Sequence, residues 1–299
     1  MSTYHTPVLI HQSIEGLNIK PDGTYVDVTF GGGGHSKEIL KQLKKGRLIA
    51  FDQDLDAIDN IIEDSRFLFV RSNYRFINNF LKYHKINKVD GIIADLGVSS
   101  YHFDEITRGF SFRADADIDM RMNQDAKISA SYILNNYDEN DLINIFRKYG
   151  EITNSPILTK KIIEYRKTNE INRINQLLKV IEYCTPKKNE NKYFAKVFQA
   201  LRIEVNQEIE SLKELLESTL NILNEKGRLV VISYHSLEDR VVKNFIKSGN
   251  FEGTVEKDIY GNFDSPFNMI NRKVIIPSDE ELVLNPRSRS AKLRIAEKN

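Results

Sequence analysis

Hydrophobic positions in the first hundred residues alternate between short continuous runs and stretches with helical spacing. A short apolar run is typical of a parallel strand that is covered on both faces. Apolar residues three or four positions apart indicate helices. The strands are expected at residues 24–30, 48–51, 67–70 and 91–94, and the helices at 36–45, 57–64 and 76–83. This alternation predicts a parallel α/β sheet.

The pattern changes between residues 105 and 192, where helical signals occur without a convincing strand. Apolar positions from Val197 to Leu220 then predict one long helix, and a strand signal returns at 229–233. A crossover between parallel strands needs only about a dozen residues, so this gap is far too long for one. We therefore interpret the chain as a discontinuous α/β domain with an inserted, all-helical domain for substrate recognition. The expected boundaries are 1–104 and 193–299 for the first and 105–192 for the second.

Composition narrows the class of protein. The chain has 299 residues, with 43 Lys and Arg against 42 Asp and Glu, so its net charge of +1 excludes a strongly basic nucleic-acid binder but not a local basic patch. The only cysteine, Cys184, leaves no disulfide framework and no cysteine-based zinc site. No apolar run approaches the roughly 18 residues of a spanning helix, and no signal peptide is evident. We expect a cytoplasmic protein that does not enter membranes.

Candidate chemistry lies where the predicted strands end. Ligands of open parallel sheets bind beyond the carboxyl ends of the strands. Four glycines, 31–34, follow the first strand, Asp52 follows the second and Asp95 follows the fourth. A carboxylate about twenty residues after a glycine turn is placed to accept from ribose hydroxyls. Each feature alone is often only a turn or a helix cap, but together they predict a nucleotide-type site.

The details of this edge favour S-adenosylmethionine over a dinucleotide. Ser36 stands where the dinucleotide fingerprint has its third glycine. Asp27, within the first strand near its end, suits a ligand with an ammonium group better than a pyrophosphate.

Eight motifs of the chain together carry a family resemblance. They are HTPVL (5–9), DVTFGGGGHS (27–36), DLGVSS (95–100), RGFSF (108–112), DMRM (119–122), FQALRI (198–203), SYHSLEDR (233–240) and NPRSRS (285–290). In these motifs the chain resembles the MraW (RsmH) family over nearly its whole length. These bacterial enzymes methylate N4 of a cytidine, position 1402, in the decoding region of 16S rRNA. The resemblance implies a class I S-adenosylmethionine-dependent methyltransferase fold, a Rossmann-like sheet with an inserted all-helical domain.

The resemblance also implies a set of cofactor contacts, to which the residue pattern adds Asp27. The implied contacts are Gly33, Gly34, His35, Asp52, Tyr74, Asp95 and His102. Tyr74 replaces a phenylalanine of many relatives, and either ring stacks on adenine. Tyr101 and His102 replace a proline and a glutamine, and the sequence does not determine the effect of that change.

Methylation of an amino nitrogen needs a hydrogen-bond acceptor close to its hydrogens, because the N4 lone pair of cytosine is delocalised. Asp95 is the candidate, either as this acceptor or as a cofactor ligand, and both roles stay open. Ser99 and Ser100 are weaker candidates for holding the base. Methylation of carbon C5 is disfavoured, since it usually needs a thiolate and Cys184 falls in the helical region. We expect no metal site.

Local cations must provide RNA binding, since the net charge is small. Arginines 108, 113 and 121 alternate with Phe110 and Phe112, which offer stacking surfaces. The candidate RNA contacts are Arg108, Arg113, Arg121, Arg240, Arg287, Arg289 and Lys292. An edge strand with solvated basic residues is the other interpretation of the C-terminal cluster, and it is compatible with RNA contact.

The expected partner is 16S rRNA or the small ribosomal subunit. A homodimer is compatible with the family, but the oligomeric state is not determined by the sequence. A methyltransferase acting on a small molecule or a protein, and a non-catalytic RNA-binding assembly factor, are the alternative functions. An NAD oxidoreductase is the least favoured, because of the broken glycine fingerprint.

Overall fold

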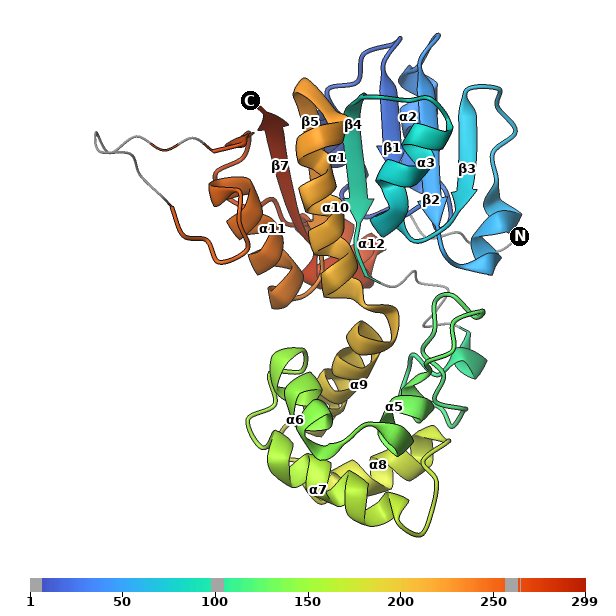
Figure 1. Cartoon of the computed structure of the whole chain (residues 1–299), viewed down its shortest axis with the longest axis vertical. Coiled ribbons are helices and arrows are strands. Elements are labelled where there is room, and N and C mark those ends of the chain that lie inside the picture. Colours follow the sequence, from blue (N-terminus) through green and yellow to red (C-terminus); the bar gives the residue numbers. More distant parts are fainter. Residues whose placement is uncertain (1–6, 98–104, 256–262, 264) are drawn as a thin grey trace. The chain divides into compact units, whose positions relative to one another are not determined.

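The structure is a computed structural model, and it describes residues 7–97, 105–255, 263 and 265–299. The chain forms two compact units (Figure 1). Residues 1–97 and 209–299 make the first, which we call the sheet unit, and residues 98–208 make the second, the helical unit.

A seven-stranded sheet forms the centre of the sheet unit, in the order β3-β2-β1-β4-β5-β7-β6. The strands are β1 (Thr24–Asp27), β2 (Arg47–Asp52), β3 (Phe67–Arg71), β4 (Val89–Asp95), β5 (Leu223–Ser233), β6 (Phe267–Met269) and β7 (Lys292–Lys298). β1 to β5 are parallel, whereas β7 is antiparallel to β5 and β6. This topology confirms the predicted Rossmann-like sheet of class I methyltransferases. β6 has only three residues, too few for a sequence pattern.

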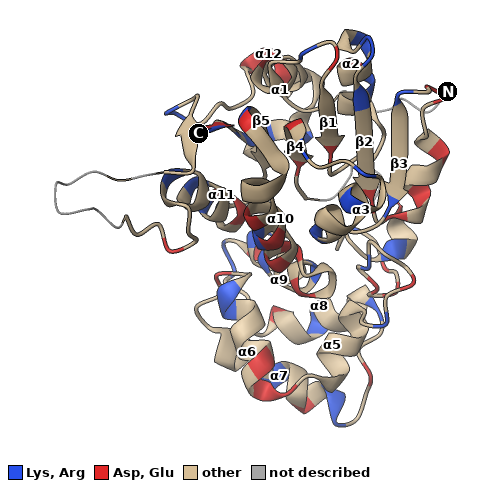
Figure 2. Ribbon diagram, turned by 45° about the horizontal axis from the view of Figure 1, so that its top comes forward, with Lys and Arg blue, Asp and Glu red and all other residues tan. Residues whose placement is uncertain are grey.

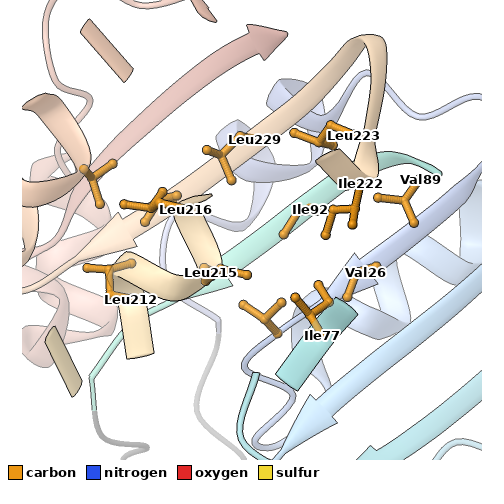
Figure 3. Packing of buried hydrophobic residues seen from close by; sticks show 14 of the residues in the cluster. Val26, Ile77, Val89, Ile92, Leu212, Leu215, Leu216, Ile222, Leu223 and Leu229 are labelled. Carbon is orange, nitrogen blue, oxygen red and sulfur yellow. The ribbon is translucent and has the colours of Figure 1, made fainter. Parts of the chain in front are cut away.

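Helices cover both faces of this sheet. They are α1 (Ile10–Leu17), α2 (Gly34–Gln42), α3 (Ile77–Tyr83), α10 (Glu208–Ile222), α11 (Ser236–Ser248) and α12 (Asp279–Leu284), with short 3₁₀ turns η1 (Leu55–Asn60), η2 (Tyr74–Phe76) and η4 (Pro286–Ser290). α3, α10 and α11 share one apolar core with the sheet, and Figure 3 shows Ile77 of α3 and Leu215 of α10 in it beside Val26 of β1. α1 and α2 share the other core. Because strand side chains alternate between faces, Tyr25 and Val26 enter opposite cores, and each buried side chain of this size contributes about 1.5–3 kcal/mol.

The helical unit contains η3 (Ile106–Arg108), α5 (Ala130–Asn136), α6 (Glu139–Lys148), α7 (Ser155–Arg166), α8 (Ile174–Glu182) and α9 (Glu190–Asn206). Asp138 caps the start of α6, since its side chain accepts from the N–H of Asp141 at 2.8 Å. Fully buried apolar side chains from several helices, among them Leu134, Phe146 and Leu201, form its interior.

The single long helix expected from Val197 to Leu220 is wrong. Gln207, with φ of 49°, is left-handed and ends α9, and α10 begins at Glu208. The apolar spacing runs through this break because both helices bury one face, so periodicity alone does not reveal it. α9 consequently belongs to the helical unit, and the unit boundaries fall at 97/98 and 208/209 rather than at 104/105 and 192/193.

A second helix prediction, residues 57–64, is also wrong. The chain forms the 3₁₀ turn η1 instead, which begins after Asp54 accepts from the N–H of Asp56 and ends where Ile61 leaves helical geometry. Within the residues that the structure describes, no helix combines the length and the apolar character needed to cross a membrane.

Candidate cofactor and catalytic site

Three neighbouring strands of the sheet unit end on an aspartate. β1 ends at Asp27, β2 at Asp52 and β4 at Asp95, and β1 lies between the other two. Figure 2 shows acidic residues at this edge of the sheet. The sequence therefore brings three predicted site residues to one edge, where α/β sheets bind ligands.

The turn between β1 and α2 requires glycine for two reasons. Gly31 and Gly33 have φ of 49° and 73°, which side chains with a Cβ rarely adopt. Gly34 has an ordinary φ, but a Cβ there would lie 2.1 Å from Cγ of Pro7. Pro7 belongs to the HTPVL motif, so this residue of the motif fits closely against the glycine turn.

Asp27 supports this turn from inside. Its side chain is 1% exposed and accepts from the Ser36 hydroxyl at 2.7 Å and from the N–H of Thr29 at 3.1 Å. Burial raises the pKa of Asp27 to about 6 despite these donors. The structure thus encloses the carboxyl that the sequence pattern assigned to contact with an ammonium group, and its two hydrogen bonds go to the glycine turn and the start of α2.

Asp52 ties the ends of β1 and β2 together. Its Oδ2 accepts from the N–H of Gly31 at 2.8 Å and its Oδ1 from the N–H of Asp54 at 2.9 Å. Each carboxylate oxygen has a further lone pair, so acceptance from ribose hydroxyls is compatible with these bonds. Tyr74 lies in η2, just after β3, and is partly buried against the core that also holds α3.

Asp95 is the carboxyl with the most altered proton affinity at this edge. Although 23% of its side chain is exposed, burial raises its pKa to about 7, and the nearby charges of Asp27 and Glu238 raise it further. The Tyr234 hydroxyl donates to Oδ1 at 2.7 Å, which lowers the pKa. The main-chain N–H of Asp95 donates to Thr29 Oγ1 at 2.7 Å.

His35 is buried and neutral. Burial lowers its pKa to about 4, and Nε2 lies 3.2 Å from the carbonyl oxygen of Val8. Because a carbonyl only accepts, this partner assigns the proton to Nε2 and leaves Nδ1 as an acceptor. Nδ1 lies 3.9 Å from Oδ2 of Asp95, beyond hydrogen-bond distance.

The carboxyl groups at this edge fit S-adenosylmethionine, because that cofactor carries a cationic sulfonium and a cationic ammonium group. Within the described part of the chain, no Lys or Arg forms an ion pair with Asp27 or Asp95. Two carboxyls with raised pKa values are stabilised in their charged form by a cationic ligand. At Gly31, by contrast, no heavy atom lies within 4 Å of an added Cβ, so the turn leaves open space there.

The predicted RNA-binding arginines of the helical unit differ in what they contact. Arg108 is 7% exposed, and its guanidinium donates to the carbonyl oxygens of Arg121 and Met122. Arg121 forms a two-pronged ion pair with Asp119, with both N···O distances 2.7 Å. Arg113 is exposed. Arg108 and Arg121 therefore support the loops around them, and Arg113 is the arginine of the three that presents its cation to solvent.

The C-terminal cations lie on the sheet unit. Arg240, Arg287 and Arg289 are exposed. Lys292 lies 3.6 Å from Asp239, which also accepts from Arg294 at 2.7 Å. β7 pairs on both sides and is not an edge strand, so the edge-strand alternative is wrong.

Three predicted residues, Ser99, Ser100 and His102, lie outside the described residues. The sequence interpretation missed Tyr234 as a partner of Asp95. The only signal was its place in the SYHSLEDR motif, since nothing local connects it to a residue 139 positions away.

Comparison with known proteins places the chain in a family. A sequence model described as the MraW methylase family matches residues 2–299. The chain is 57% identical to ribosomal RNA small subunit methyltransferase H of Bacteroides thetaiotaomicron, covering 99% of this chain and 98% of that protein. It is 58% identical to the protein of the same name from Parabacteroides distasonis, with the same coverage. Among solved structures it is similar to an rRNA methylase from Streptococcus thermophilus, at 12% identity and a TM-score of 0.44, covering 97% of this chain and 95% of that one. The chain belongs to the MraW methylase family.

Proposed function

We propose that this member of the MraW methylase family transfers a methyl group from S-adenosylmethionine to N4 of a cytidine in 16S rRNA, at position 1402 of the decoding region. Close relatives that match over their full length are named ribosomal RNA small subunit methyltransferases. The observation in the structure that carries the proposal is Asp95, a carboxyl at the ligand-binding edge of the sheet with a pKa near 7.

S-adenosylmethionine supplies the methyl group from its sulfonium. Asp95 accepts a hydrogen bond from the attacking amino group, which localises the nitrogen lone pair and takes up the developing positive charge. The carboxyl does this in its ionised form, so activity rises as pH passes through the pKa of Asp95. Asp27, buried behind the glycine turn, adds a second negative charge on the same side.

Gly33, Gly34 and His35 hold the cofactor through the main chain of the turn into α2. Asp52, which the N–H groups of Gly31 and Asp54 hold at the end of β2, accepts from the ribose hydroxyls. Tyr74 offers a ring for the adenine. Ser99, Ser100 and His102 keep the roles that the sequence assigned to them.

RNA phosphates are contacted by exposed cations. Arg113 of the helical unit and Arg240, Arg287 and Arg289 of the sheet unit are exposed, and half-buried Lys292, beside Asp239, completes the set. Since the substrate is ribosomal, the reaction belongs in the bacterial cytoplasm. Analytical ultracentrifugation distinguishes the monomer from the homodimer that the sequence leaves open.

The test is transfer of labelled methyl groups to small ribosomal subunits from a strain that lacks the modification. Nucleoside analysis is expected to give N4-methylcytidine with the wild-type protein and almost none with Asp95→Ala. A wild-type protein that binds the cofactor but labels no RNA would contradict the proposed substrate. An Asp95→Ala protein that is folded and fully active would contradict the role of Asp95.

A further inference from the structure

Tyr234 contacts the end of β4 twice. Its hydroxyl donates to Oδ1 of Asp95 at 2.7 Å. Its ring lies against Gly97, where an added Cβ would be 3.4 Å from Cδ2 of the tyrosine. Gly97 has φ of 99°, a conformation that favours glycine. One side chain from the end of β5 thus holds both the carboxyl and the main chain that follows it.

The start of α11 fixes the main chain of Tyr234. Its N–H donates to Oε2 of Glu238 at 3.0 Å, and Glu238 is 2% exposed. Glu238 and His235 form the capping box of this helix. The position of the tyrosine hydroxyl is therefore set by a helix end rather than by a loose connection.

The two oxygens of Asp95 have different surroundings. Oδ1 is taken by the Tyr234 hydroxyl. Oδ2 lies 3.9 Å from Nδ1 of neutral His35, and both atoms are acceptors, so an N–H donor satisfies Oδ2 where His35 does not. The charged groups that act on Asp95 are Asp27 from β1 and Glu238 from α11, both of which disfavour its ionisation.

We propose that Tyr234 is a positioning residue for methyl transfer, which holds Oδ1 of Asp95 so that Oδ2 is the oxygen that receives the N–H donor. This inference rests on the proposed function. Tyr234 acts through Asp95 and touches neither substrate nor cofactor in this role. Burial, together with Asp95, Glu238 and Glu281, raises the pKa of Tyr234 well above 10, so its hydroxyl keeps its proton and remains a donor.

The role has a measurable signature, because a donor to a carboxylate favours the ionised form. Removing the hydroxyl raises the pKa of Asp95 by about one unit, the size expected for one hydrogen bond to a charged group. Below this pKa the variant is less active than the wild type, and above it the two proteins converge.

The test compares Tyr234→Phe with a matched control, Tyr25→Phe. The hydroxyl of Tyr25, a buried side chain in β1, accepts from the N–H of Lys20 at 2.7 Å, so the control also loses one hydrogen bond of the sheet unit. Carboxyl ¹³C NMR of aspartate-labelled protein, with the Asp95 signal assigned from Asp95→Asn, gives the pKa directly. We expect an upward shift of about one unit in Tyr234→Phe and none in Tyr25→Phe. An unchanged Asp95 titration in Tyr234→Phe would overturn the proposal.

The acidic limb of kcat/KM against pH reports the same group in the free enzyme. In Tyr234→Phe it is expected to move up by about one unit, with activity falling up to about tenfold at pH 6.5 and staying within about twofold at pH 8.5. A loss that is equal at every pH, or a limb that stays in place while the NMR titration moves, would show a merely structural role. If the wild type methylates no RNA, the proposed function fails. In that case the pH dependence of S-adenosylmethionine affinity, measured by calorimetry, replaces the pH dependence of kcat/KM. An acidic limb that moves up in Tyr234→Phe would then support the role of Tyr234, and one that stays in place would contradict it.

Discussion

Two places in the chain, the Arg202–Glu208 pair of the helical unit and the ligand edge of the sheet, treat buried charge in opposite ways. In the helical unit, Arg202 meets Glu208 through two hydrogen bonds of 2.8 and 2.9 Å, with side chains only 14% and 9% exposed. In the sheet unit, Asp27 and Asp95 have raised pKa values, and no Lys or Arg of the described residues pairs with either.

This difference is the one that we expect between charges that serve the fold and charges that serve a ligand. When a buried charge has a partner of opposite sign within the fold, the attraction between the two offsets the cost of desolvation whether or not a ligand is bound. An acid held at a sheet edge without a cation costs stability, and the cost is offset when a cationic group binds. Removing charge at these two places should accordingly have opposite effects on the free energy of unfolding.

The largest expected effect on stability is in the helical unit. Arg202→Met leaves Glu208 buried without its partner and should lower the free energy of unfolding by about 3 kcal/mol. Urea denaturation measures this. The control is Lys161→Met, which breaks an exposed pair with Glu164 and should cost less than about 0.5 kcal/mol. An equal decrease in the free energy of unfolding in Arg202→Met and Lys161→Met would show that the buried pair contributes no more than the exposed one.

Removing the acid of the sheet unit should do the reverse. In the folded state the pKa of Asp95 is near 7, whereas in the unfolded chain it is about 3.9, so the folded state binds more protons between these values. Stability from this group is present below pH 4 and is lost as pH rises through 7. Asp95→Asn should therefore be about 1–2 kcal/mol more stable than the wild type at pH 8, while methyl transfer falls about 100-fold.

Urea denaturation across pH 4–8, followed by the methylation assay on the same samples, checks both parts. Asp64→Asn is the control. Asp64 is paired with Arg66 near the start of β3, at the opposite end of that strand from the candidate site. If Asp95→Asn is less stable than the wild type at pH 8, Asp95 stabilises the fold, and the contrast with the Arg202–Glu208 pair does not hold.

A smaller effect is expected on cofactor affinity. The pKa values of Asp27 and Asp95, about 6 and about 7, mean that both carboxyls ionise between pH 6 and pH 8. A cationic ligand prefers the ionised form, so S-adenosylmethionine should bind about tenfold more tightly at pH 8 than at pH 6. Calorimetry in two buffers measures the affinity and the protons released. An affinity that does not change over this range would show that these acids do not face the cationic groups.

The smallest effect concerns RNA contacts on the surface. Arg289→Gln removes one exposed cation and should weaken binding of small subunits about threefold, while reducing the salt dependence of binding by somewhat less than one counterion. Binding measured over a series of salt concentrations gives both values. Arg108→Gln should instead destabilise the helical unit, because it removes donors to two carbonyl oxygens. A variant at Arg289 with an unaltered salt slope would remove this residue from the interface.

The parallel strands β1 to β5, and the family, were accessible from local patterns. Short apolar runs identified β1 to β5, and the eight motifs identified the family before any contact was known. Both signals are contained in neighbouring residues. The glycine turn, Asp52 and Asp95 were predictable for the same reason, since each follows a predicted strand directly, whereas Asp27 was expected inside its strand.

The sequence by itself therefore determined the class of fold, the family and the edge of the sheet where the candidate site lies. Only the tertiary structure decided which cations are exposed, since Arg108 and Arg113 look alike in the chain and differ in their contacts. It also decided that Gln207 divides a helix and that Tyr234 holds Asp95. These features depend on packing between residues distant in the sequence, and local propensity and spacing carry no information about such contacts.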